Sequence, residues 1–339
     1  MNYLPEIHAF LTKPGGGPTR PMGPKISVIT PTYYRNDLLR ETIESVSRQS
    51  YDPVEHIVVD DSGERHAKPI LAEYDKIEAI YRDENGGWAG AYTTGIEAST
   101  GQYIQLLDDD DYLLEGKLEK TADILRENPD VGVSYCGAIR GDEGCIEPKP
   151  EVSGDILRHA LRFQTFPLWT GSMLMERDVL VDCMPLAGMD PSDDLEIELG
   201  DTDLKIELAR RTKFDYVDEC LVYYRRGGNE LWTGLRKFRK VKQNVEHQQD
   251  LYDQYPDIKR ALLSAWYERQ GKNWLRERPW SANAVQCFLK SAYFADENRL
   301  PKAVEAAASL FGRPGLYAAR AARDVAFGNP QENANPDDA

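Results

Sequence analysis

The sequence lacks the features that mark the commonest membrane and nucleotide-binding classes. It has no apolar run near the ~20 residues that a membrane-spanning helix needs. No early segment has the basic-then-apolar order of a signal peptide. Neither the Walker A pattern GxxxxGK(S/T) nor the dinucleotide-binding pattern GxGxxG occurs. These absences exclude a P-loop enzyme and predict a soluble protein of the cytoplasm.

Cysteine is scarce and irregularly spaced. The chain has five, an odd number: Cys136, Cys145, Cys183, Cys220 and Cys287. No two of them have the CxxC spacing that zinc sites and redox pairs use. We therefore expect reduced thiols rather than a disulfide framework or a zinc site.

Positive charge is also in short supply. The 339 residues include 41 Lys and Arg against 57 Asp and Glu, a net charge of −16. Binding to a nucleic-acid backbone relies on clustered Lys and Arg, so we expect no nucleic-acid partner. The same balance argues against attachment to an anionic membrane by charge alone. With 41% hydrophobic residues, the chain can build one large domain or two moderate ones.

Apolar, β-branched runs alternate with amphipathic segments from residue 25 onward. The expected strands are 25–30, 54–61, 76–81, 102–107 and 131–139, and the expected helices are 37–49, 67–75, 88–100 and 117–129. Asn36 or Asp37 is placed to cap the first of these helices. Such alternation with short joints predicts an α/β fold with a mostly parallel central sheet and helices on both faces. Ligands of such sheets bind beyond the carboxyl ends of the strands.

The rest of the chain has a different pattern. We divide the sequence into an N-terminal segment and Gly/Pro linker (1–24), the α/β domain (25–228), a helical C-terminal region (229–327) and a disordered tail (328–339). Within the α/β domain, residues 155–163, 169–180 and 201–211 have helical patterns, and residues 213–226 return to a strand. Residues 282–311 suggest a helical hairpin.

Four adjacent aspartates, residues 108–111, follow the strand 102–107. Acid-rich turns also follow the strands that end at residues 61 and 81, so three such turns meet at one edge of the sheet. Turn chemistry alone explains most Asp and Gly residues, but crowded carboxylates need either protonation or a cation. Mg²⁺ and Mn²⁺ prefer oxygen ligands and link carboxylates to substrate phosphates. The sequence therefore predicts a metal-assisted site for nucleotide-diphosphate chemistry.

Several motifs, in order, resemble those of family 2 glycosyltransferases, which have the GT-A fold. The matching segments are ISVITPTYYR, HIVVDDS, ENGGWAGAYTTGIEASTGQYIQLLDDDD and LGDTDLKIELARR. The resemblance covers residues 25–226 and implies the GT-A fold with inverting transfer of a sugar from a nucleotide-diphosphate donor. No QxxRW motif, as in processive polysaccharide synthases, is present, so transfer of a single sugar is favoured.

The resemblance implies a role for each residue that matches a motif position. The nucleotide-sugar-binding residues would be Pro31, Thr32, Tyr33, Asp60, Asp61, Gly86, Gly87, Asp108 and Asp109. Asp110 would be the principal ligand of Mn²⁺ or Mg²⁺, with Asp108 assisting. Asp111 has an alternative role as the cap of the helix that follows.

Asp201 falls where the family has its catalytic base, which takes the proton from the acceptor hydroxyl. Asp201 and Asp203 also suit the first turn of a helix, where the dipole favours acids. Asp193 and Asp194 are the reserve candidates for the base. Trp169 falls in the acceptor-side segment, where it either stacks on a sugar ring or packs in the core.

The sequence departs from the family pattern at three places. Tyr34 replaces the usual Asn, and Tyr92 and Thr93 replace the Arg and Asn of many members. The stretch YYRRGGN lacks a histidine that some members use as a third metal ligand. Arg225 or Arg226 would then meet the diphosphate directly.

We therefore expect an inverting, metal-dependent hexosyltransferase that moves one sugar from a UDP-, GDP- or dTDP-sugar to a glycan or lipid-linked acceptor. One alternative is a sugar-nucleotide nucleotidyltransferase, although residues 31–37 are not the Gly-rich basic loop of those enzymes. The other is a non-catalytic GT-A-like domain that binds glycans or scaffolds a complex. For the helical region, whose residues 310–328 are basic and weakly amphipathic, three roles stay open: acceptor binding, contact with the inner face of a membrane, and homodimer formation.

Overall fold

The computed structural model describes residues 23–141, 143–185, 200–225, 234–296 and 298–327. The predictions for the segment 1–22, the tail 328–339, Asp193, Asp194 and Arg226 lie outside these residues. The chain divides into two compact units, Met1–Glu230 and Leu231–Ala339.

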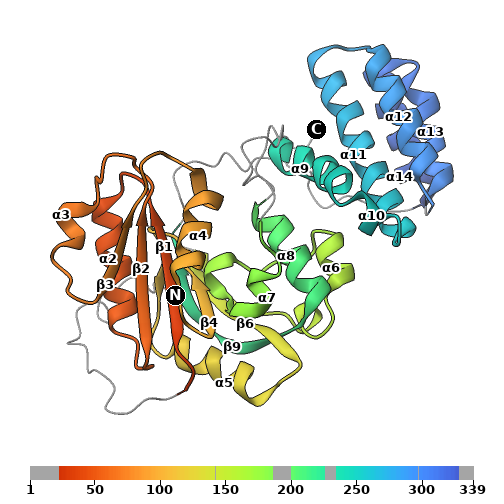
Figure 1. The fold of residues 1–339 in the computed structure, drawn as a ribbon. Helices are drawn as coiled ribbons and strands as arrows, with labels where there is room; N and C mark the ends of the chain where they lie inside the picture. The colour runs from red at the N-terminus through yellow and green to blue at the C-terminus, as the bar shows by residue number, and fades with distance from the viewer. Residues whose placement is uncertain (1–22, 142, 186–199, 226–233, 297, 328–339) are drawn as a thin grey trace. The chain divides into compact units, whose positions relative to one another are not determined.

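The first unit is built on one curled sheet (Figure 1). Its strands are β1 (Ile26–Thr32), β2 (Val54–Asp60), β3 (Ile77–Tyr81), β4 (Tyr103–Leu106), β5 (Tyr112–Leu113), β6 (Val131–Arg140), β7 (Gly144–Ile146), β8 (Leu174–Glu176) and β9 (Lys213–Tyr224). They lie in the order β3-β2-β1-β4-β8-β6-β9-β5, and β7 pairs with β6. From these pairings β1, β2, β3, β4, β6 and β9 run in one direction and the other three run against them. The prediction of a mostly parallel α/β sheet is confirmed.

Helices cover both faces of this sheet. They are α2 (Asn36–Ser47), α3 (Lys68–Leu71), α4 (Gly87–Ala98), α5 (Lys117–Glu127), α6 (Leu157–Leu161), α7 (Arg177–Val181) and α8 (Gly200–Arg211). Alternation along β2 divides the packing, because neighbouring side chains of a strand point to opposite faces. Val58 packs in a cluster with residues of α2 and α3, whereas Ile57 and Val59 pack with Ala91 of α4. The expected βαβ layering follows from this alternation.

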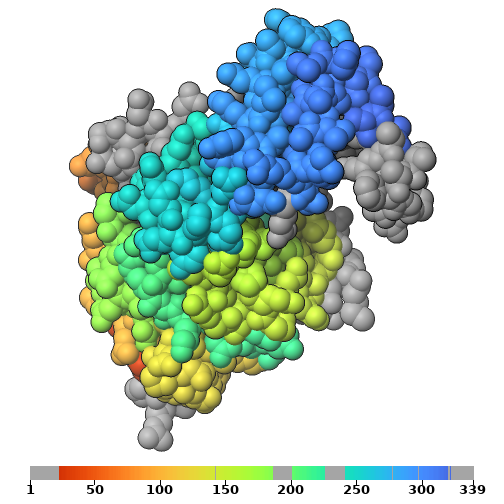
Figure 2. Space-filling model, turned by 90° about the vertical axis from the view of Figure 1, so that its right-hand side faces the viewer, coloured from red at the N-terminus to blue at the C-terminus, as the bar shows by residue number. Residues whose placement is uncertain are grey.

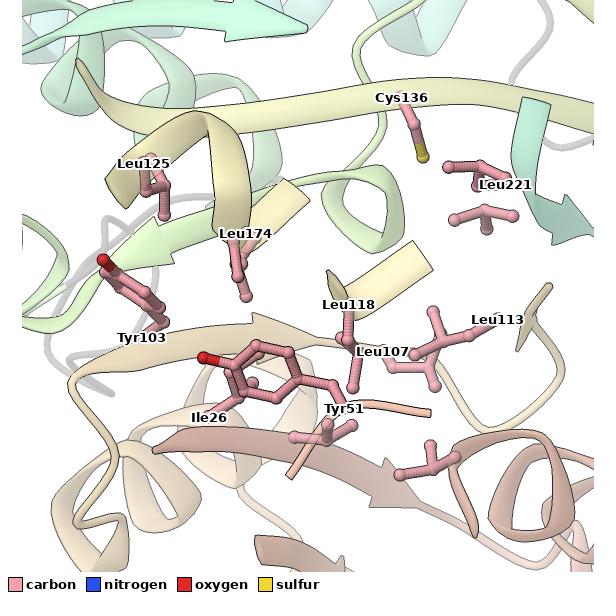
Figure 3. Packing of buried hydrophobic residues seen from close by; sticks show 14 of the residues in the cluster. Ile26, Tyr51, Tyr103, Leu107, Leu113, Leu118, Leu125, Cys136, Leu174 and Leu221 are labelled. Atoms are coloured by element: carbon pink, nitrogen blue, oxygen red, sulfur yellow. The ribbon is translucent and has the colours of Figure 1, made fainter. Parts of the chain in front are cut away.

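The main hydrophobic cluster lies between α2, α5 and the sheet (Figure 3). Leu107, Leu113 and Leu118 are fully buried there, and Figure 3 shows them converging beside Tyr51. Burial of a Leu side chain contributes ~1.5–3 kcal/mol. This packing fixes the end of β4, from which the four aspartates continue.

Two predictions of local structure were wrong. Residues 169–180 do not form a helix: they contain a short 3-10 helix (Thr170–Ser172), β8 and α7. Met175 is fully buried where β8 pairs with β4 and β6, so tertiary pairing overrides the local pattern. Neither Asn36 nor Asp37 caps α2, whose cap position is Arg35 without a side-chain bond. The Asn36 amide donates instead to the carbonyl of His66 at 3.2 Å.

The prediction that all cysteines are reduced was also wrong. Cys145 of β7 and Cys220 of β9 form a disulfide, and Cys136, Cys183 and Cys287 are free. The pair is 75 residues apart in sequence, and β6 brings it together because β7 and β9 both pair with β6. Gly137 of β6 leaves the necessary space, since a Cβ there would lie 2.9 Å from the Cys220 sulfur. Sequence spacing carries no trace of this pairing.

The second unit is entirely helical in its described residues. Its helices are α9 (Gly234–His247), α10 (Gln249–Tyr252), α11 (Pro256–Glu277), α12 (Ala282–Phe294), α13 (Arg299–Ser309) and α14 (Gly312–Phe327), drawn in cyan and blue in Figure 2. The predicted hairpin corresponds to α12 and α13, which pack with α11 and α14 around Phe288 and Leu316. None of the described helices has both the length and the apolar character required to cross a membrane.

Candidate active site

The register of the sheet brings the predicted site residues to one edge. Thr32, the last residue of β1, pairs with Asp60, the last residue of β2. On the other side of β1, the Leu107 amide donates to the Ile29 carbonyl at 3.0 Å, which continues the pairing with β4. The turns after β1, β2 and β4 therefore open side by side, as predicted.

Asp60 orders the turn after β2. Its two carboxylate oxygens accept the amide hydrogens of Ser62 at 3.0 Å and Ala67 at 2.7 Å. Both oxygens are bonded and only 1% of the residue is exposed, so Asp60 holds the turn after β2 in place.

Asp61 is held by an arginine that the motifs did not single out. Its Oδ1 lies 2.7 Å from Nε of Arg82, and its carboxylate accepts the amide hydrogen of Gly86. A Cβ at Gly86 would lie 2.2 Å from the Arg82 guanidinium, so a larger residue there would displace the arginine from its present position. Gly87 follows with φ +69°, a conformation that glycine adopts without strain. Asp61 thus contacts both Arg82 and the start of the turn that leads into α4.

Asp109 and Asp110 share a second arginine, Arg35. The Arg35 Nη1 lies 3.2 Å from Asp109 Oδ1 and 3.0 Å from Asp110 Oδ2. The hydroxyl of Thr32 donates to the other oxygen of Asp109 at 2.8 Å. Burial raises the pKa of Asp109, and the Thr32 bond and Arg35 oppose that rise. Asp109 is 5% exposed and fixed on both oxygens, whereas Asp110 projects further into solvent. Tyr33, which follows Thr32, is 52% exposed, and Pro31 is half-buried within β1.

Asp108 receives its hydrogen bond from Tyr92 of α4. The Tyr92 hydroxyl donates to Asp108 Oδ1 at 2.8 Å, and Tyr92 is fully buried. Burial raises the pKa of Asp108 to about 6, opposed by the Tyr92 bond and reinforced by Asp110, Asp109 and Asp201. Tyr92 was identified only as a departure from the family pattern, and the structure gives it a direct contact with the site.

The prediction that Asp111 caps the following helix was wrong. The cap position of α5 is Gly116, which has no side-chain bond. Asp111 is 2% exposed, and its Oδ1 accepts the amide hydrogen of Arg225 at 2.9 Å. The Arg225 guanidinium donates to the Asp110 carbonyl at 3.2 Å and to Glu41 at 2.5 Å. Asp111 therefore ties the aspartate turn to the end of β9.

Asp201, in the first turn of α8, is oriented by two neighbours. The Thr170 hydroxyl donates to Asp201 Oδ1 at 2.7 Å, and Lys205 Nζ lies 3.0 Å from Oδ2. Gly171, the neighbour of Thr170, lies against the aspartate turn, because a Cβ there would be 3.8 Å from Asp111 Oδ2. The Asp201 carboxylate also adds to the raised pKa of Asp108. Burial raises the pKa of Tyr224 to about 12, and the carboxylates of Asp111, Asp108, Asp110 and Asp201 add to the rise. A carboxylate from α8 thus stands beside the aspartate turn, although ninety residues separate Asp201 from Asp111 in the sequence.

Trp169 packs partly in the core, which is one of the two roles that its sequence position left open; its acceptor-side role stays a prediction. One part of this half-buried ring packs against the main hydrophobic cluster. The ring stacks on Tyr224 at a centroid distance of 5.8 Å and contacts Phe166 edge-on at 5.3 Å. The 3-10 turn that follows Trp169 carries Thr170, which places the ring next to the partner of Asp201.

Asp108 and Asp110 suit a divalent cation as a pair. Both provide hard oxygen ligands, and burial, together with the neighbouring carboxylates, raises the pKa of Asp108. Within the part of the chain that the structure describes, no three His, Cys, Asp or Glu side chains converge on a metal position. Two carboxylates are the usual protein contribution to a Mg²⁺ site that substrate phosphates complete. The donor set therefore fits a metal that binds together with a diphosphate.

Sequence reasoning missed four partners in this site: Arg35, Arg82, Thr170 and Lys205. Arg82 directly follows a strand, and Lys205 lies one helical turn after Asp201. An i,i+4 search around Asp201 would have found Lys205. The contacts of Arg35 and Arg82 depend on tertiary placement.

Comparison with known proteins agrees with this geometry. Residues 27–183 match the model of glycosyl transferase family 2. Residues 27–183 therefore belong to family 2 of the glycosyltransferases. Its matched stretch contains the turns after β1, β2, β3 and β4, but ends before Asp201.

Curated relatives match part of the same region. The family 2 domain is similar to the uncharacterized glycosyltransferase RP339 of Rickettsia prowazekii, with 34% identity over 153 residues, 43% of this chain and 46% of that protein. It is also similar to the uncharacterized glycosyltransferase YwdF of Bacillus subtilis, with 40% identity over 100 residues, 29% of this chain and 37% of that protein. The chain spans about half the length of these relatives or less.

A solved structure shares the fold across a longer range. S. aureus TarS 1-349 in complex with UDP-GlcNAc superposes with a TM-score of 0.57 and 15% identity, over 91% of this chain and 93% of TarS. This likeness extends the GT-A fold assignment beyond the family 2 match.

Proposed function

We propose that this protein is an inverting glycosyltransferase that moves a single sugar, of the hexosyl type, from a nucleotide-diphosphate sugar to a glycan or lipid-linked hydroxyl. The observation that carries the proposal is the pairing of two separate acidic groups at one sheet edge. The aspartate turn supplies Asp108 and Asp110, and α8 supplies Asp201, oriented by Thr170 and contributing to the raised pKa of Asp108.

Asp201 acts as the general base in this proposal. Inversion is a single displacement, in which the acceptor oxygen forms a bond to the anomeric carbon as the bond to the diphosphate oxygen breaks. The acceptor proton passes to a carboxylate oxygen of Asp201. Lys205 and Thr170 hold both oxygens of Asp201, which fixes the direction in which the carboxylate accepts that proton.

Asp110 and Asp108 would hold Mn²⁺ or Mg²⁺, and such a cation supplies positive charge to the departing diphosphate. The chain's own residues prepare this place. Arg35 holds Asp110 and Asp109 together, and Tyr92 holds Asp108. On the other side, Asp61, Gly86 and Gly87 would form the nucleobase end of the pocket, with Thr32 and Asp109 nearer the ribose.

Two alternatives predict different products. A sugar-nucleotide nucleotidyltransferase would consume a nucleoside triphosphate and release pyrophosphate, and a glycan-binding scaffold would release nothing. TarS was solved with UDP-GlcNAc bound, which supports a nucleotide sugar as the donor class. The acid pair at the sheet edge supports transfer over scaffolding.

The test is release of nucleoside diphosphate from UDP-, GDP- and dTDP-sugars with Mn²⁺ or Mg²⁺, with and without candidate acceptors. We expect one donor family to be turned over, and Asp110→Ala to abolish turnover. Asp201→Asn should lower transfer by about 10²–10⁴ while leaving donor binding intact. The control is Asp130→Asn, because the Asp130 side chain is 81% exposed and forms an ion pair with the exposed Lys213.

Pyrophosphate release from a nucleoside triphosphate and a sugar phosphate would establish the nucleotidyltransferase instead. Binding of donor without turnover by any acceptor tested, unchanged in Asp201→Asn, would favour the scaffold. Full activity of Asp201→Asn would refute the assignment of the base.

A further inference from the structure

The two units of the chain carry opposite charge. Residues 1–230 contain 24 Lys and Arg against 44 Asp and Glu, whereas residues 231–339 contain 17 against 13. Up to residue 327, where α14 ends, the second unit has only 10 acidic residues. The strongly negative total of the chain therefore conceals a basic helical unit.

This basic unit also exposes large apolar side chains. Five of them are Trp280 (55% exposed), Leu300 (76%), Val304 (49%), Leu310 (59%) and Phe311 (76%), and we call these five the apolar edge. Leu300, Val304 and Phe311 are spaced four and seven residues apart along α13 and the residues that follow it. Within α13 this spacing puts Leu300 and Val304 on one helical face, and the Phe311 amide donates to the Ala308 carbonyl in the turn that ends the helix.

The end of the apolar edge is a built structure. The indole N–H of Trp280 donates to the Leu310 carbonyl at 3.0 Å, and the Arg313 amide donates to the Pro279 carbonyl at 2.8 Å. Between them Gly312 has φ +66°, and a Cβ there would lie 2.2 Å from the Pro279 carbonyl oxygen. These contacts hold the loop before α12 against the loop before α14.

Trp280 satisfies its polar atom inside the protein and leaves its ring exposed. A tryptophan of this kind suits the boundary between lipid headgroups and acyl chains, where apolar rings and polar tips are both accommodated. Exposed cationic side chains adjoin the apolar edge in sequence: Arg278 lies two residues before Trp280, and Arg299 directly precedes Leu300. The Arg313 guanidinium donates to the carbonyls of Leu275 and Arg276, at the end of α11.

We propose that the apolar edge docks the helical unit on a bilayer that contains anionic lipids. Exposed aliphatic and aromatic side chains would enter the interface, and the basic charge of the unit would attract the headgroups. Charge complementarity favours this partner over a second copy, since pairing two identical basic edges would bring like charges together. Nucleic acid also carries negative charge, but it has no apolar surface that would bury the five exposed side chains of the apolar edge.

The proposal does not depend on the catalytic assignment. The test is co-sedimentation of the full chain with vesicles of phosphatidylcholine alone and of phosphatidylcholine mixed with phosphatidylglycerol. We expect binding to the mixed vesicles, weakened by high salt. Phe311→Glu should lower the bound fraction by roughly tenfold, since each large apolar side chain that enters the bilayer contributes about that factor. Arg278→Glu should reduce binding to the anionic vesicles selectively.

The matched control is Val181→Glu, which places the same charge at a 42% exposed apolar side chain of α7 in the first unit. Donor turnover without vesicles should be equal in wild type, Phe311→Glu and Val181→Glu, which separates docking from catalysis and from misfolding. Equal binding of Phe311→Glu and wild type would overturn the proposal. So would a dimer in sedimentation velocity that Phe311→Glu dissociates, without binding to either vesicle.

Discussion

The Tyr92 hydroxyl lies 2.8 Å from Asp108 Oδ1 and donates to it, at a position where the family pattern led us to expect arginine. Burial and the nearby aspartates raise the pKa of Tyr92 well above its ordinary value, so the phenol stays protonated and remains a donor. A hydrogen bond from a neutral group therefore holds Asp108, whereas Asp109 and Asp110 are held by the charged Arg35.

This relationship predicts the effect of Tyr92→Phe. Loss of a hydrogen bond to a charged group costs ~1.5–3 kcal/mol, so we expect the dissociation constant for metal and donor to rise roughly tenfold or more. Isothermal titration with the donor and Mn²⁺ measures this directly. Tyr103→Phe is the control, because Tyr103 is also buried but belongs to the core cluster. Equal weakening in both variants would mean a general packing defect.

Thr170 should act through Asp201 and not on the donor. Thr170→Val removes the hydroxyl that donates to Asp201 Oδ1 while keeping the shape of the side chain. We expect kcat to fall by roughly tenfold, as for loss of one hydrogen bond to a charged group, while the KM for the donor is unchanged. Thr170→Ser should restore kcat, because it keeps the hydroxyl. A fall in kcat that serine does not restore would show that the methyl group is what matters.

Much of the fold could be predicted because its signals are local. The run KISVIT is rich in apolar, β-branched residues, as a strand buried on both faces must be, and the structure has β1 at Ile26–Thr32 with Ile26, Val28 and Ile29 fully buried. The alternation of strands and helices then indicated which turns share an edge. Asp60, Asp61 and Asp108 were placed correctly at that edge by topology alone.

The wrong predictions share a physical cause. β8 is three residues long, Leu174–Glu176, and exists because β4 and β6 flank it, which no local period reveals. The disulfide between Cys145 and Cys220 likewise depends on β6 lying beside both of its strands. Asp111 lies in a turn, where an aspartate can cap the next helix, but its carboxylate instead accepts the backbone amide hydrogen of Arg225, which directly follows β9. Long-range pairing decided each case against the local propensity.

His56 makes the stability of the fold depend on acid. It is 6% exposed in β2, contacts the Thr30 hydroxyl at 3.0 Å, and burial lowers its pKa to about 3. In the unfolded chain its pKa is near 6.5, so between these values the unfolded state binds the extra proton and the folded state does not. The contribution of the neutral His56 to the free energy of unfolding is complete above pH 6.5. It is lost as the pH falls, by up to ~1.4 kcal/mol per pH unit.

We therefore expect the free energy of unfolding to fall less steeply from pH 6.5 to 4 in His56→Gln than in wild type, measured by urea denaturation. His66→Gln is the matched control, since His66 is exposed and its replacement should keep the wild-type slope. If the free energy of unfolding fell equally steeply with pH in wild type and His56→Gln, His56 could not be a buried neutral histidine.

Two glycines of α4 should respond to alanine with opposite sign. A Cβ at Gly95 would lie 2.3 Å from Ile29 Cγ2 and 3.3 Å from Val59 Cγ2, in the core beneath the helix. Forcing a methyl group into such packing costs ~1–3 kcal/mol. At Gly90 the nearest atom would be the flexible Arg82 Nη2 at 3.4 Å, so Gly90→Ala should gain helix propensity, up to ~1 kcal/mol. Thermal unfolding of the two variants measures the difference, and a higher Tm for Gly95→Ala than for wild type would show that α4 can shift away from the sheet.

Because α4 carries Tyr92 and begins at Gly87, close in sequence to the Asp61 partner Gly86, Gly95→Ala should also lower turnover, whereas Gly90→Ala should preserve it.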